Sequence, residues 1–191
     1  MVPAALLAGL LAALSLSACS VGGTDQQGVI VGSGDVVMYP PGQRHGVVHL
    51  SGTTLDGKSY RLDGSAAATV VNVWWSDCGP CIKEAPLLRD ASQRWGNAVG
   101  FVGVATRDAS ENSARAFEQK YGLRYPSLWS PDGSALLGFP SQYTLSTIPE
   151  TAVLDKDHRV AAIIHGEIPS QLTLDEVVRC VIHPRGPHCY S

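Results

Sequence analysis

The 191-residue sequence is poor in charged side chains, and its basic residues form no cluster. The 14 Lys and Arg residues are scattered, and the formal net charge is only −3. A nucleic-acid surface requires a concentrated basic patch, so nucleic-acid binding is excluded. The chain also has no internal repeat, which excludes a repeat architecture. Its length and apolar fraction of 45% are instead typical of one folded domain with tails.

No Lys or Arg precedes Arg44, although the chain begins with a long apolar run. Residues 1–18 are small and apolar, which predicts a signal peptide despite the missing basic residues. The end of this run, Leu16-Ser17-Ala18-Cys19, resembles the bacterial lipobox, so we expect a lipid on Cys19 after cleavage. An uncleaved membrane anchor is the alternative, because the run is at the short end of what spans a bilayer. Both interpretations place the remaining chain outside the cytoplasm and attached to the cell membrane.

Residues 19–44 are rich in Gly, Ser, Asp and Gln and show no periodicity, so we interpret them as a flexible linker carrying Cys19. Residues 45–191 are expected to form a single domain with a C-terminal tail. Strands are expected at 47–50, 60–62, 69–74, 99–106, 127–129, 151–154 and 160–164, and helices at 79–95, about 110–121 and 172–182. This order predicts an α/β fold with a central mixed β-sheet flanked by helices.

Cys78-Gly79-Pro80-Cys81 is the most informative motif, because it lies directly between an apolar strand and a helical pattern. This position places Cys78 at the helix N-terminus, where free backbone N–H groups and the helix dipole stabilise a thiolate. Cys81 lies one turn further on the same face and can close a disulfide. A metal half-site and an inert pair are the alternatives. No second Cys or His pair lies nearby to complete a zinc site, so we predict a redox dithiol and no metal.

The motifs together resemble the thioredoxin superfamily, and within it the TlpA/ResA-like thiol-disulfide oxidoreductases that are tethered to bacterial membranes. The resemblance covers about residues 45–182. It is carried by Val71-Asn72-Val73-Trp74, Cys78-Gly79-Pro80-Cys81, Glu84, Pro86 and Thr147-Ile148-Pro149-Glu150-Thr151. It implies a thioredoxin fold with an inserted helix and strand before Pro149, and it implies that Pro149 is cis.

The resemblance also implies roles for individual residues. Cys78 would attack a substrate disulfide, and Cys81 would resolve the mixed disulfide without any cofactor. The backbone of Ile148, next to Pro149, would pair with an extended substrate segment. Glu84 would exchange protons with the cysteines if burial raised its pKa. The alternative for Glu84 is an ordinary solvated residue on the helix surface.

Two positions around the motif depart from the family pattern. Asp77 replaces the usual Trp before the first cysteine, and a carboxylate there disfavours the thiolate unless Asp77 is merely a surface residue. Asp77, together with Gly79 and Pro80, is therefore expected to tune the redox potential. Trp75 is an additional aromatic residue, which we expect to contribute to substrate binding. Asn72 occupies the place of the buried acid of cytoplasmic thioredoxins.

Cys180 and Cys189 lie near His183 and His188 in the C-terminal tail. An oxidising compartment favours a structural disulfide between the two cysteines. A Cys/His metal site and free thiols are the alternatives. His165, at the end of an expected strand, is either near the active site or an ordinary core or surface histidine.

We therefore expect a lipid-anchored, extracytoplasmic thiol-disulfide oxidoreductase that reduces disulfides of exported proteins. The resemblance implies that a membrane thiol carrier supplies the electrons and that apocytochrome c is among the substrates. A disulfide-forming oxidant and a non-catalytic binding lipoprotein are the alternative functions.

Overall fold

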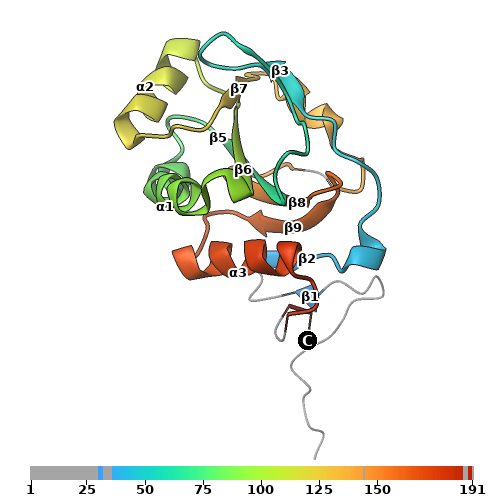
Figure 1. Ribbon diagram of the computed structural model, residues 1–191. Helices are drawn as coiled ribbons and strands as arrows, with labels where there is room; N and C mark the ends of the chain where they lie inside the picture. The colour runs from blue at the N-terminus through green and yellow to red at the C-terminus, as the bar shows by residue number, and fades with distance from the viewer. Residues whose placement is uncertain (1–29, 32–35, 144, 187–188, 191) are drawn as a thin grey trace, which may run out of the picture.

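The computed structural model describes residues 30–31, 36–143, 145–186 and 189–190 (Figure 1). The predicted signal peptide and Cys19 lie outside these residues, so cleavage, lipidation and the membrane tether stay predictions. Within the described ranges, none of the helices combines the length and apolar character needed to cross a bilayer.

The strands of the described residues form a seven-stranded mixed sheet in the order β1-β2-β9-β8-β5-β6-β7. β5, β6 and β7 run parallel, while β1, β2, β9 and β8 continue the sheet from β5 by antiparallel pairing. The strands are β1 (Ile30–Val31), β2 (Val36–Met38), β5 (Ala68–Trp74), β6 (Val99–Ala105), β7 (Ser127–Trp129), β8 (Glu150–Asp155) and β9 (Val160–His165). This arrangement confirms the predicted mixed sheet.

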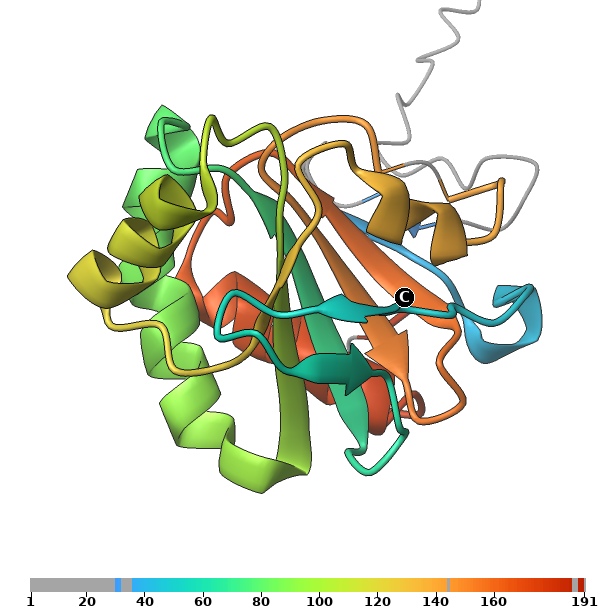
Figure 2. The same ribbon diagram turned by 90° about the horizontal axis from the view of Figure 1, so that it is seen from above.

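In the described part of the chain, three α-helices pack on one face of the sheet: α1 (Gly79–Trp95), α2 (Glu111–Tyr121) and α3 (Gln171–Ile182). The connections β5-α1-β6 and β6-α2-β7 are successive parallel crossovers, and their common handedness places α1 and α2 on the same side (Figure 2). Trp74 at the end of β5 stacks on Phe117 of α2, with ring centroids 4.5 Å apart. The helices therefore cover the face from which the even-numbered side chains of β5 project.

The opposite face is covered by the hairpin β3 (Ser51–Thr53)–β4 (Ser59–Arg61) and by the 3₁₀ helix η3 (Ser134–Gly138). The preceding segment also packs there, because Val48 and Leu50 are buried in the same core cluster. The predicted strand at 47–50 is wrong, since the strand pairing begins only at Ser51. The apolar alternation correctly indicated burial, but the backbone here bonds to a turn and to η3 and forms no strand ladder, since the Val48 N–H donates to the His158 carbonyl and the His49 N–H to the Gly138 carbonyl.

Local sequence signals account for the helix ends. The Ser110 hydroxyl accepts a hydrogen bond from the Ser113 N–H at the start of α2, and Ser170 caps α3 in the same way. Gly122 ends α2 with a φ of +69°, a left-handed conformation that favours glycine. These caps are why the predicted helix boundaries agree closely with the observed ones.

The folded domain begins earlier than residue 45. β2 pairs antiparallel with β9, and Arg44 is only 6% exposed. Its Nη1 donates to the Asp155 carboxylate over 3.0 Å. The prediction of a flexible linker over 19–44 is therefore wrong for residues 36–44. β2 is too short to show a strand periodicity in its sequence. It forms a strand because it pairs with the edge of β9.

The C-terminal tail is joined to α3 by a disulfide between Cys180 and Cys189, with an S–S distance of 2.05 Å. The bridge places Tyr190 beside Arg44, and the Arg44 Nη2 donates to the Tyr190 hydroxyl over 2.7 Å. Arg44 thus connects the N-terminal segment, the β8–β9 turn through Asp155 and the tail.

Replacing both Cys180 and Cys189 with serine will lower the free energy of unfolding of the oxidised protein by about 2–3 kcal/mol, because the bridge closes a short loop in the unfolded chain. Urea denaturation monitored by fluorescence measures this loss. An unfolding free energy equal to that of the wild type would show that the bridge does not stabilise the fold.

Candidate active site

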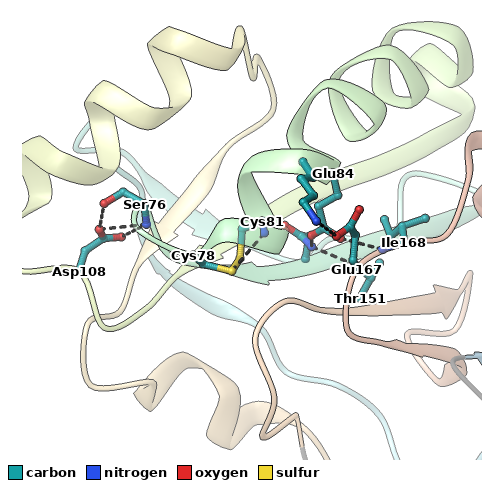
Figure 3. Close-up of a disulfide and its surroundings, with 10 residues drawn as sticks. Ser76, Cys78, Cys81, Glu84, Asp108, Thr151, Glu167 and Ile168 are labelled. Atoms are coloured by element: carbon teal, nitrogen blue, oxygen red, sulfur yellow. Dashed lines mark hydrogen bonds and ion pairs between the residues drawn. A yellow bond between two sulfur atoms is a disulfide. The ribbon is translucent and has the colours of Figure 1, made fainter.

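The two cysteines of the motif form a disulfide at the N-terminus of α1 (Figure 3). The S–S distance is 2.06 Å and the Cα–Cα distance is 5.2 Å. Cys78 is the N-cap of α1, and its Sγ accepts the Cys81 N–H over 3.1 Å. In the reduced protein, the same N–H and the helix dipole would stabilise a Cys78 thiolate. Cys78 is 4% exposed and Cys81 only 1%, so both cysteines are buried and the first residue is the slightly more accessible one.

The loop that leads from β5 to Cys78 is fixed by a buried carboxylate. The Ser76 N–H donates to Asp108 Oδ1 over 3.1 Å, and the Ser76 hydroxyl donates to the same oxygen. Figure 3 shows Asp108 reaching this loop from the segment that follows β6. Asp108 does not cap the following helix α2, because Ser110 fills that role. Asp77, in contrast, is exposed, so solvent screens its effect on the neighbouring sulfur.

Glu84 lies on α1 one turn after Cys81 and is only 2% exposed. Its Oε1 accepts the Asn72 Nδ2 over 2.8 Å, and its Oε2 accepts the Ile168 N–H over 3.0 Å (Figure 3). Asn72 Nδ2 also donates to the Thr151 hydroxyl over 3.0 Å. Burial raises the pKa of Glu84 to about 7, while the two hydrogen bonds oppose this rise and the nearby Glu167 adds to it. Glu84 is therefore not a solvated helix residue.

The Ile148–Pro149 peptide bond is cis, and Pro149 is buried. Ile148 and Trp75 both pack against the apolar cluster that contains Cys78 and Cys81. The structure thus brings the predicted substrate-binding residues to the redox pair. Among the described residues, no group of His, Cys, Asp and Glu has the arrangement of a metal site.

Glu150 and His165 form a pair next to the cis-proline that was not predicted from the sequence. Glu150 is 1% exposed, and its Oε1 lies 2.6 Å from His165 Nδ1. Its Oε2 accepts the Thr147 N–H over 3.2 Å. Glu150 belongs to the motif that carries the family resemblance, but only the β8–β9 register shows that it lies opposite His165. This carboxylate therefore fixes the loop that contains Ile148.

Replacing Glu150 with alanine will raise the KM for a protein disulfide about tenfold, because the loop that contains Ile148 loses the hydrogen bond from the Thr147 N–H that holds it, and a hydrogen bond to a charged group is worth about 1.5–3 kcal/mol. Glu150→Gln retains an acceptor and should raise the KM much less. Steady-state kinetics measures both variants. Equal increases for Ala and Gln would show that the negative charge matters and that the hydrogen bond does not.

Fold and site together define a thioredoxin-fold thiol-disulfide oxidoreductase. The chain belongs to the Redoxin family, whose sequence model matches residues 35–178. The thiol-disulfide oxidoreductase ResA of Bacillus cereus is 27% identical over 116 residues, which are 60% of this chain and 65% of ResA. The match therefore spans just under two thirds of that relative. These findings confirm the TlpA/ResA-like resemblance.

Two solved structures share the fold over nearly their whole length. A DsbF homologue from Corynebacterium diphtheriae superimposes with a TM-score of 0.66 and 31% identity, covering 77% of this chain and 93% of that one. A secreted thiol-disulfide isomerase from Corynebacterium glutamicum gives a TM-score of 0.66 and 28% identity, covering 79% of this chain and 93% of its own. The thioredoxin fold predicted from the sequence is thereby confirmed.

Proposed function

We propose that this enzyme reduces disulfides of exported proteins outside the cytoplasm, with Cys78 as the nucleophile and Cys81 as the resolving thiol. The observation that carries this proposal is the disulfide at the N-terminus of α1, which lies beside the Pro149 loop and one helical turn before the buried Glu84. This site combines three groups: a sulfur activated by the helix N-terminus, the Pro149 loop that can pair with an extended substrate, and Glu84, which can accept a proton.

The reaction proceeds in two exchanges. The Cys78 thiolate attacks one sulfur of the substrate disulfide, forming a mixed disulfide and expelling a substrate thiolate that takes up a proton. Cys81 then loses its proton, which Glu84 can accept, and its thiolate attacks the Cys78 sulfur. The Cys78–Cys81 disulfide forms and the second substrate thiolate leaves. Two electrons pass to the substrate, so an external dithiol must reduce the enzyme before the next cycle.

The reducing direction, the location and the partners rest on separate arguments. Gly79 and Pro80 resemble the pair of reducing thioredoxins. The predicted signal peptide and lipidated Cys19, together with the secreted relative from Corynebacterium glutamicum, support a position outside the cytoplasm. A membrane thiol carrier would then be the electron donor. The TlpA/ResA-like resemblance implies apocytochrome c as one substrate, with a role in cytochrome c maturation.

The reduction potential, measured by equilibration with a glutathione or dithiothreitol buffer, tests the direction. We expect a value closer to that of thioredoxin, about −270 mV, than to that of DsbA, about −120 mV. A potential near the latter would make the enzyme a disulfide-forming oxidant. A protein that turns over no disulfide at all would support the non-catalytic alternative. Mass spectrometry of the exported protein, compared with a Cys19→Ser variant, tests the lipid anchor.

A further inference from the structure

The turn that carries the chain from β5 to α1 is bonded at both sides of Cys78. The Cys78 N–H donates to the Trp75 carbonyl over 3.2 Å, and the Cys78 Sγ accepts the Cys81 N–H over 3.1 Å. Backbone N–H groups at a helix N-terminus stabilise a thiolate only when the sulfur lies within their reach. The position of this turn relative to α1 therefore decides how well the Cys78 thiolate is stabilised.

The middle of the turn is bonded to Asp108. The Ser76 N–H lies 3.1 Å from Asp108 Oδ1 and 3.3 Å from Oδ2, and the Ser76 hydroxyl also donates to Oδ1. Figure 3 shows Asp108 on the opposite side of the disulfide from Glu84. The backbone and the hydroxyl of one turn residue are thus both held by a carboxylate from the segment after β6.

Asp108 is a buried acid without a basic partner. It is only 7% exposed, and none of the Lys, Arg and His side chains in the described part of the chain forms an ion pair with it. A buried charge costs free energy unless it is paired or hydrogen-bonded. The donors of Ser76 are therefore the groups that stabilise this carboxylate in its place. Asp77 and Arg107, the nearest charged residues along the chain, are both exposed.

The residue before Asp108 is conformationally strained. Arg107 has a φ of +56°, in the left-handed region that a residue with a Cβ enters at a cost in free energy. The Arg107 N–H donates to the Pro131 carbonyl over 3.0 Å, which holds this conformation. Strained residues that their surroundings hold in place cluster at active sites. Here the strained residue stands directly before the carboxylate that holds the redox turn.

We propose that Asp108 is a positioning residue for the nucleophile. By fixing Ser76, it keeps the Cys78 sulfur on the Cys81 N–H in the reduced enzyme. This inference rests on the proposed function and adds a second carboxylate to it, with a different task. In the proposed reaction Glu84 accepts a proton, whereas Asp108 takes part in no bond or proton exchange and acts only through the turn.

Replacing Asp108 with alanine will raise the pH midpoint for alkylation of Cys78 by about one unit, because a released turn weakens the hydrogen bond that stabilises the thiolate. Iodoacetamide alkylation of the reduced protein over a range of pH measures this midpoint, and mass spectrometry identifies the modified cysteine. Asp108→Asn retains an oxygen that can accept from Ser76, so it should restore most of the wild-type midpoint.

Asp132 provides the matched control. Its Oδ1 accepts the N–H of Ser134 over 3.0 Å and the hydroxyl of Ser134 over 2.7 Å, but Asp132 is exposed and lies outside the redox turn. Asp132→Ala should therefore leave the midpoint unchanged. If Asp108→Ala does not fold, Ser76→Ala carries the test. It removes only the hydroxyl donor and should raise the midpoint in the same direction by a smaller amount.

An unchanged midpoint in Asp108→Ala or, if that protein does not fold, in Ser76→Ala would overturn the inference, and so would an equal rise in Asp132→Ala. An Asp108→Asn protein that rises as far as the Ala variant would overturn it too. A midpoint in Asp108→Asn well below the wild type would show that the carboxylate acts by repelling the thiolate, which also contradicts positioning. These outcomes leave reduction of disulfides by the wild type intact. Failure of the proposed function is distinct, since the wild-type protein would then reduce no disulfide, whatever the midpoints.

Discussion

Replacing Cys78 with serine will reduce disulfide exchange by more than ~10³-fold, because a hydroxyl at this position is not ionised at neutral pH and cannot attack sulfur. Replacing Cys81 with alanine will have a different result. Cys78 will still capture the substrate, but the mixed disulfide will accumulate because no second thiol lies beside it. Non-reducing electrophoresis and mass spectrometry of the trapped species measure this accumulation and identify the substrate.

The second disulfide provides the matched control for these variants. A protein in which Cys180 and Cys189 are both serine retains the dithiol at α1, so it should keep its exchange activity. If replacing Cys180 and Cys189 reduced the exchange activity as much as replacing Cys78 does, the assignment of Cys78 as the nucleophile would be contradicted. Trapping through Cys78 in a Cys81→Ala protein would also distinguish the enzyme from a non-catalytic binding protein.

Replacing Glu84 with glutamine will slow the resolving step by about 10²-fold at neutral pH, because a positioned acid-base group typically contributes that much. Glu84 is one helical turn from Cys81, and both side chains are buried. With the pKa of Glu84 raised to about 7, the carboxylate that accepts the proton from Cys81 becomes available as the pH rises through neutrality. The wild-type rate should therefore show a step near pH 7, and the Gln variant should lack this step.

The same substitution will change how stability depends on pH. The pKa of Glu84 is about 7 in the folded protein and near 4.5 in the unfolded chain, so the folded state binds the proton more tightly. The stabilisation from this proton is complete below about pH 4.5 and is lost as the pH rises to about 7. The loss is about 3 kcal/mol in the free energy of unfolding.

Urea denaturation of wild type and Glu84→Gln between pH 4 and pH 8 measures this difference. The Gln variant should lose less stability than the wild type over this range. The glutamine side-chain oxygen can still accept the Ile168 N–H. Its amide group can donate to Asn72 if the Asn72 amide flips, so the variant is expected to fold. Parallel stability curves and an unchanged rate profile would remove Glu84 from the mechanism.

Much of the fold was predictable because its signals are local. The strand at 69–74 and the helix after Cys78 depend on neighbours in the chain, and the structure confirms them. The hairpin of β8 and β9 was equally visible from its alternation and turn. The errors lie at the N-terminus, where β2 and the segment at 47–50 take their conformation from distant partners and not from their own sequence.

The sequence alone determined the spacing of Cys78 and Cys81, their place between a strand and a helix, and hence the dithiol chemistry, because these properties follow from neighbouring residues. The tertiary structure decided which carboxylates belong to the active site. Burial gives Glu84 its raised pKa, and β-sheet register joins Glu150 to His165. Solvent exclusion and strand register are properties of the assembled molecule, so no local pattern encodes them.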